Sequence, residues 1–282
     1  MSASPAPDFL AAMARSSALR VAEARARESA GALVARAAAA ASSPSLALDP
    51  AGFDLIAELK LRSPAQGVLS GSDDDLEERV LAYARAGAAI VSVLTEPARF
   101  AGSLAHLARA SAVLRSAGVP AMRKDFLVDP YQLLEARAAG AGGALLIVRM
   151  LERTRLAEML AAAFELGLFV LLEAFDAADI ATATELAALW RGPRAHCLIG
   201  INSRDLKSLA VVPGRLEELA RLLPAGHPRV AESGLATAAD AARLASHGFS
   251  LALVGTALMA DADPARLAKA MIAAGRHAAV AR

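Results

Sequence analysis

Eight short apolar runs recur along the chain, and their spacing constrains the fold more than any other feature. Each run is followed by a polar loop and a longer segment of helical periodicity, and successive runs begin roughly 20–35 residues apart, the repeat of a β/α unit. The runs are DLIAELK, AAIVSVLT, PAMRKD, ALLIVRM, FVLLEAF, CLIGIN, RVAES and SLALVG. Strands that alternate with helices form a parallel sheet, and eight of them in 282 residues predict a closed (β/α)8 TIM barrel.

Residues that start and end helices support this repeat. Asp129 and Asp263 each precede a proline, and Thr237 with Asp240 forms a capping-box pattern. Glycines close five of the predicted helices: Gly87, Gly118, Gly140, Gly167 and Gly248. An open, doubly wound sheet is the alternative fold, but no G-x-G-x-x-G follows the first strand, which weakens a dinucleotide-binding version of it.

A helical segment precedes the first apolar run. Apolar residues fall loosely on one face of a helix over about residues 8–40, and the string ASSPSLALDP then breaks it. We therefore expect an N-terminal helical extension over residues 1–48 and a barrel catalytic domain over residues 49–282.

Charge and composition exclude several classes of partner. The net charge of +1 gives no global field that would attract nucleic acid or an acidic membrane, and no stretch approaches the roughly 20 apolar residues of a membrane span. The single cysteine, Cys197, lies in an apolar run and is expected to be buried. The N-terminus carries Asp8 and Glu23, unlike acid-poor transit peptides, so we expect a cytoplasmic protein.

Polar residues collect at the C-terminal ends of the apolar runs. They are Glu58, Lys60, Lys124, Arg149, Glu173, Asn202, Glu232 and Ser233. In a barrel these ends form one face, which carries the catalytic residues. Glu58 and Lys60 are two positions apart and point to the same side of a strand. A lone charged residue at a strand end is usually a cap or a salt-bridge partner, and ion-pair clusters occur at barrel mouths. The coincidence of several favours a catalytic array whose charges neutralise one another.

Two glycine turns predict a phosphate site. Ser233-Gly234 ends the seventh run and Gly255-Thr256 ends the eighth, and a helix start is expected after each. The loops after these two strands, with a short extra helix such as GTALMA, are the usual phosphate site of a TIM barrel. Glycine lets backbone N–H groups approach the anion. Taken alone, either turn also suits an ordinary tight bend, and the two together favour a phosphorylated substrate.

Together these motifs resemble those of indole-3-glycerol-phosphate synthases, and the resemblance extends from about residue 8 to 272. The strings that carry the resemblance are AELKLRSP, VSVLTEPARFAGS, MRKDFLVDPYQLLEARAAGA, LLIVRML, VLLEAFD, GINSRDL, AESGL and LVGTALM. The resemblance implies ring closure, decarboxylation and dehydration of 1-(2-carboxyphenylamino)-1-deoxyribulose 5-phosphate in tryptophan biosynthesis, by a carboxy-lyase. It also implies that no metal and no organic cofactor takes part.

The resemblance further implies a role for each site residue. Lys124 would be the main general acid, and Glu173 would handle the proton of the substrate amine. Lys60 would hold the substrate carboxylate and assist dehydration with Glu58. The substrate would be oriented by Asn202, Arg204, Glu232 and Ser233. The phosphate would lie against Ser63, Gly234, Gly255 and Thr256. The aromatic ring would pack on Phe100, Phe126 and Leu206.

The sequence departs from the family in one loop. The string SPAQG has Ala65 and Gln66 where the family usually has a small polar residue and a base. The resemblance also predicts a monomer whose partner is a small molecule, with neither nucleic acid nor membrane. A different phosphate-binding barrel enzyme and a non-catalytic barrel are the other classes considered, although a scaffold has no need of charged strand ends.

Overall fold

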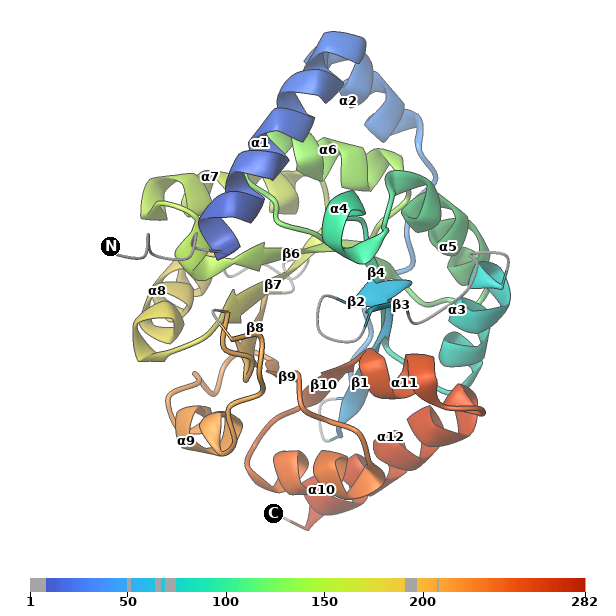
Figure 1. The fold of residues 1–282 in the computed structure, drawn as a ribbon, viewed down its shortest axis with the longest axis vertical. Helices are drawn as coiled ribbons and strands as arrows, with labels where there is room; N and C mark the ends of the chain where they lie inside the picture. The colour runs from blue at the N-terminus through green and yellow to red at the C-terminus, as the bar shows by residue number, and fades with distance from the viewer. Residues whose placement is uncertain are drawn as a thin grey trace, which may run out of the picture.

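Eight parallel strands close into a barrel in the computed structural model, which describes residues 9–49, 52–63, 67–68, 75–190, 197–206 and 208–281 (Figure 1). The barrel strands are β1 (Asp54–Leu59), β4 (Ile90–Leu94), β5 (Ala121–Lys124), β6 (Gly143–Ile147), β7 (Phe169–Ala174), β8 (Cys197–Asn202), β9 (Arg229–Glu232) and β10 (Leu251–Val254). They follow chain order around the barrel, and β10 closes on β1 with Asp54 opposite Leu251. The TIM barrel expected from the apolar runs is confirmed.

Helices surround the barrel (Figure 1). The longer ones are α3 (Leu76–Arg85), α5 (Leu104–Ser116), α6 (Pro130–Ala138), α7 (Arg153–Glu165), α8 (Ala177–Ala188), α9 (Arg215–Ala220), α10 (Ala238–Ser246) and α12 (Pro264–Val280). Short helices lie in three loops: α4 (Pro97–Phe100), the 3-10 turn η1 (Val148–Met150) and α11 (Thr256–Ala260). The expected caps are present: Asp129 accepts from the Tyr131 N–H in a capping box, and Thr237 forms a second box with Asp240.

Alternation along each strand separates two apolar cores. In β1, Leu55 belongs to the core between strands and helices, whereas Ile56 belongs to the core inside the barrel. The same side of β1 as Ile56 continues through Glu58 to Lys60, because side chains two apart share a face. The inward-facing side chains are therefore apolar along the strands and become polar at the C-terminal ends of the strands.

The N-terminal segment forms two helices, α1 (Phe9–Arg27) and α2 (Ala30–Ala39), so the expectation of one helix over residues 8–40 is wrong. The helix is interrupted at Ser29, whose backbone is extended and whose side chain accepts a hydrogen bond from the Ala32 N–H. Breaking the helix there satisfies a backbone donor at the start of α2. Helix α1 lies beside α6 (Figure 1), where the Gln132 amide donates to Oγ of Ser17, and its Leu10 and Met13 are buried with the inner core of the barrel.

A small hairpin follows β1 that the sequence did not predict. Its strands are β2 (Arg62–Ser63) and β3 (Gly67–Val68), which pair antiparallel. Ala65 and Gln66, where the sequence departs from the family, lie outside the described residues. Across the described part of the chain, every helix is too short or too polar to cross a membrane.

Candidate active site

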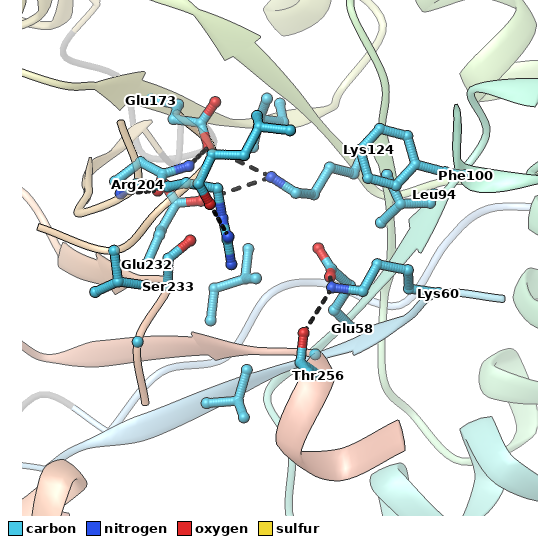
Figure 2. Close-up of a pocket in the computed structure, with 18 of the residues that line it drawn as sticks. Glu58, Lys60, Leu94, Phe100, Lys124, Glu173, Arg204, Glu232, Ser233 and Thr256 are labelled. Atoms are coloured by element: carbon cyan, nitrogen blue, oxygen red, sulfur yellow. Dashed lines mark hydrogen bonds and ion pairs between the residues drawn. The ribbon is translucent and has the colours of Figure 1, made fainter. Parts of the chain in front are cut away.

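A cavity of about 520 Å³ opens at the C-terminal end of the barrel strands (Figure 2). Its lining includes these residues expected from the sequence: Glu58, Lys60, Phe100, Lys124, Phe126, Glu173, Asn202, Arg204, Leu206, Glu232, Ser233, Gly234, Gly255 and Thr256. The remaining one, Ser63, lies in β2, and its side chain is not among those described. The structure thus brings residues from seven separate segments around a single space.

Lys124, the last residue of β5, reaches two carboxylates across the cavity. Its ammonium lies 3.4 Å from Oε1 of Glu173 at the end of β7 and 3.7 Å from Oε2 of Glu232 at the end of β9 (Figure 2). Burial disfavours the charge on Lys124, but the neighbouring carboxylates raise its pKa above the usual value. Lys124 is therefore a protonated donor at neutral pH.

Lys60 forms a second cationic position in the same cavity. Its ammonium lies 3.1 Å from Oε1 of Glu58 and donates to Oγ1 of Thr256 at 3.1 Å. Figure 2 shows the ammonium groups of Lys60 and Lys124 both directed into the cavity, with Glu58 and Thr256 near the first and Glu173 and Glu232 near the second. The site therefore has two cation–carboxylate groups, one on each side of the same space.

Two glycines make room for the buried carboxylates. A Cβ atom on Gly200 would lie 2.3 Å from Oε1 of Glu232, and one on Gly255 would lie 2.3 Å from Oε1 of Glu58. Both glycines face inward on strands next to the one that carries the carboxylate, since Gly200 is in β8 and Gly255 follows β10. The sequence therefore removes side chains at the positions where Glu232 and Glu58 need space.

Glu232 is the most perturbed acid of the site. It is 1% exposed, and neither carboxylate oxygen has a hydrogen-bond partner among the described residues. Burial raises its pKa well above the usual value, the charges of Glu173 and Glu58 raise it further, and Lys124 opposes them. The direction of this shift favours the neutral form of Glu232 and so lessens the repulsion between Glu232 and Glu173.

Asn202 fixes the orientation of Glu173. Its amide donates to Oε1 of Glu173 at 2.8 Å, and its own oxygen accepts from the backbone N–H of Arg204 at 2.9 Å. These two bonds also distinguish the nitrogen of the amide from the oxygen. The guanidinium of Arg204 donates to the backbone oxygen of Leu209 at the rim of the cavity. The end of β8 and the loop after it therefore hold both the Glu173 carboxylate and the Arg204 guanidinium in place.

The two glycine turns lie at one end of the cavity. Ser233 and Gly234 both have left-handed backbones, with φ of 70° and 79°, and a Cβ atom on Gly234 would meet Val211 at 2.9 Å. Gly255 precedes α11, the short helix expected at GTALMA. The helix expected after Ser233-Gly234 is α10, which begins at Ala238 with Thr237 as its cap. Its capping box ties the helix start to Thr237 and leaves the turn as a separate loop.

Aromatic and aliphatic side chains form an apolar wall of the same cavity. The rings of Phe100 and Phe126 lie 6.3 Å apart, and Phe9 of α1 contacts Phe126 edge to face at 5.7 Å. The sequence reasoning missed Phe9, which is remote in sequence from the barrel, and Phe175 after β7. Other lining residues that it missed are Leu10, Leu94, Leu145, Ile147 and Leu253. Their apolar character gave no signal to separate them from ordinary core residues.

Arg149 does not belong to the cavity, although its position at a strand end suggested it. It forms ion pairs with Asp176 and with Asp179, the latter at 2.7 Å, and lies over the ring of Phe175 at 4.9 Å. It lines a neighbouring hollow of about 320 Å³ beside α1. Two carboxylates at the start of α8 therefore hold this cation outside the cavity.

Asp125 is a buried residue beside the site that sequence reasoning missed. Burial would raise its pKa, but Arg20 and Arg123 lower it to about 2. Arg20, 105 residues away on α1, donates to both of its oxygens at 2.9 and 2.7 Å. Because Asp125 stands between Lys124 and Phe126, the ion pair anchors α1 next to the cavity.

A metal ion needs several ligating side chains close together. Within the described ranges, no group of three or more histidine, cysteine, aspartate or glutamate residues could hold one. Cys197 is buried as expected, and burial raises the pKa of its thiol to about 12. The chemistry available in the cavity is therefore proton transfer by lysines and carboxylates beside glycine turns suited to an anion.

Fold and site together define a class: a (β/α)8 barrel with lysines, carboxylates and glycine turns around a cavity at the C-terminal face, where enzymes of this fold carry their active sites. A family model described as "Indole-3-glycerol phosphate synthase" matches residues 10–271. The chain belongs to this family, as the sequence resemblance indicated.

Relatives and solved structures agree with this assignment. The chain is 40% identical over 246 residues to the "Indole-3-glycerol phosphate synthase" of Rhodococcus jostii, covering 86% of this chain and 87% of that one. It is 38% identical over 262 residues to "Indole-3-glycerol phosphate synthase 1" of Streptomyces coelicolor, covering 92% and 93%. A thiamine phosphate pyrophosphorylase from Pyrococcus furiosus is similar in structure, with a TM-score of 0.58, 14% identity and coverage of 80% and 96%. At that identity the likeness shows the fold alone.

Proposed function

We propose that this chain converts 1-(2-carboxyphenylamino)-1-deoxyribulose 5-phosphate to indole-3-glycerol phosphate. The ring carbon that bears the carboxylate attacks the ketone carbon, CO₂ leaves, and loss of water completes the indole. The observation that carries the proposal is the placement of Lys124, 3.4 Å from Glu173 and 3.7 Å from Glu232, across the same cavity from the Lys60–Glu58 pair. Ring closure needs an acid at the ketone oxygen, and dehydration needs an acid–base pair.

Lys124 serves as the general acid in the first step. As the ketone carbon is attacked, its oxygen becomes an alkoxide, which is a stronger base than an amine and takes a proton even from a lysine whose pKa is raised. Glu173, held by Asn202 at 2.8 Å, stabilises positive charge on the substrate nitrogen and removes its proton. Glu232 and Ser233 orient the substrate with Arg204.

Lys60 and Glu58 assist the later steps. Lys60 holds the carboxylate that leaves as CO₂, and with Glu58 it then assists departure of the hydroxyl group. Its hydrogen bond to Thr256 also places the ammonium beside the proposed phosphate site, so one cation serves both anionic groups of the substrate. The phosphate lies against the backbone of Gly234, Gly255 and Thr256, together with Ser63.

The aromatic ring lies on the apolar wall. Phe100, Phe126 and Leu206 pack on it, and they line the same cavity as the glycine turns. Holding both ends brings the ring carbon to the ketone, and this positioning supplies a large part of the rate enhancement.

The remaining proposals concern the whole protein. Residues 1–48 form an extension that covers part of the mouth of the barrel, and residues 49–282 form the catalytic domain. The protein works as a monomeric carboxy-lyase in the cytoplasm, without a metal or organic cofactor, and its partner is the small-molecule substrate.

The test is an assay of the purified protein with the proposed substrate. Formation of indole-3-glycerol phosphate is followed by the rise in indole fluorescence, with CO₂ release measured in parallel. Equal amounts of both products are expected. Binding of the substrate without either product, or turnover only of an unrelated sugar phosphate, would assign the chain to a different reaction.

A further inference from the structure

Glu96 is a buried carboxylate in a loop whose next three residues are exposed. It follows Thr95 after β4 and is 1% exposed, whereas Pro97, Ala98 and Arg99 all face solvent. Burial of a carboxylate is costly unless hydrogen bonds compensate it. The hydrogen-bond partners of Glu96 therefore indicate what the buried carboxylate stabilises.

Three successive backbone N–H groups compensate this carboxylate. Ala98 and Arg99 donate to it at 3.0 and 2.6 Å, and Phe100 donates at 3.2 Å. Pro97 has no N–H to donate. Helix α4 is a single turn, too short for its backbone N–H groups to find partners within the helix. Glu96 accepts a hydrogen bond from each of these N–H groups.

The end of the turn is fixed equally firmly. The backbone oxygen of Glu96 accepts from the Gly102 N–H at 2.9 Å. Between them Ala101 has a left-handed backbone with φ of 55°, a conformation that disfavours alanine. A Cβ atom on Gly102 would lie 2.2 Å from the backbone oxygen of Leu94. The turn that carries Phe100 therefore folds tightly back on the end of β4.

We propose that Glu96 is a positioning residue for the substrate's aromatic ring, acting through Phe100. Its carboxylate sets the backbone of α4, and α4 aims the ring of Phe100 at Phe126 on the apolar wall of the cavity. The inference rests on the proposed function, because it assumes that a carboxyphenyl group occupies this wall. Glu96 itself lies behind the wall and is not among the residues that line the cavity.

The test is a double-mutant cycle between Glu96→Gln and Phe100→Ala. The probe is the substrate with its ketone reduced to an alcohol, which cannot cyclise, and its Kd is measured by calorimetry. We expect Glu96→Gln to weaken binding about tenfold and to raise KM similarly, with kcat within about threefold of the original. In the Phe100→Ala background the same change should alter Kd by less than about twofold, since the ring that Glu96 aims is gone.

Glu152→Gln is the matched control. Glu152 also precedes a helix, but it is exposed and its side chain caps no N–H, so its replacement should leave Kd and KM unchanged. Equal effects of Glu96→Gln with and without Phe100, or none in either, would overturn the proposal and leave Glu96 as a support of the fold. If Glu96→Gln does not fold, Glu96→Asp replaces it in the cycle, with the same non-additivity required. Failure of the proposed function is seen separately, as binding of the probe without turnover of the substrate.

Discussion

Replacement of Glu232 by glutamine tests the charge balance of the site. Glutamine keeps the shape of the side chain, and the oxygens of Glu232 have no hydrogen-bond partner to lose within the described structure. The Lys124 ammonium lies 3.7 Å from Glu232 and keeps its contact with Glu173 at 3.4 Å in the variant. If burial and Glu173 hold Glu232 protonated, the substitution replaces one neutral group by another.

The sign of the effect on stability follows from the raised pKa. Between the unfolded pKa of about 4.3 and the raised folded pKa, the folded protein holds a proton on Glu232 that the unfolded chain has lost. The free energy of unfolding therefore falls as pH rises through this window, by up to about 1.4 kcal/mol per pH unit. Glu232→Gln removes that dependence, so its stability relative to the original protein should rise with pH.

The assay is urea unfolding between about pH 5 and 8, followed by circular dichroism, with Glu165→Gln at an exposed position as the control. An infrared spectrum of the folded protein should also lose one protonated carboxylic acid band in Glu232→Gln. A difference in stability that stays constant with pH, together with an unchanged infrared band, would show that Glu232 is ionised and that the reasoning is wrong.

Three further predictions address the chemistry. Lys124→Ala should lower kcat at least about 10²-fold with an unchanged circular dichroism spectrum, and Glu173→Gln should lower it strongly as well; a near-normal rate in either variant would remove that residue from its role. Gly255→Ala should displace Glu58 and lower kcat/KM about tenfold, whereas Gly226→Ala, whose Cβ atom would meet nothing within 4 Å, should have no effect. A chelator should leave activity unchanged, and inactivation that zinc or magnesium reverses would contradict metal-free chemistry.

The fold was accessible from the sequence because its signals are local and repeated. Apolar runs, proline-linked caps and terminal glycines each report on a few residues, and they agree along the chain. The same logic placed Lys124 and Glu173 on one face, because the ends of parallel strands meet there. The end of α1 was harder to predict, because Ser29 lies within a pattern that is otherwise helical and instead caps the start of α2.

The rest of the site depends on contacts between distant segments. Arg20 and Asp125 are 105 residues apart, and nothing in either local sequence pairs them. Arg149 carried the same signal as Lys124, but Asp176 and Asp179 hold it outside the cavity. Phe9 becomes a wall of the site only because α1 packs there. Such pairings are set by tertiary packing, which periodicity and spacing do not report.

A crystal structure with indole-3-glycerol phosphate bound is the sharpest test of the proposal that one cavity holds both ends of the substrate between two lysines. We expect the phosphate to lie at the backbone of Gly234 and Gly255 and the indole to lie between Phe100 and Phe126. Lys124 would then lie within hydrogen-bond reach of the product. A phosphate bound beside Arg149, or an indole outside the cavity, would contradict it.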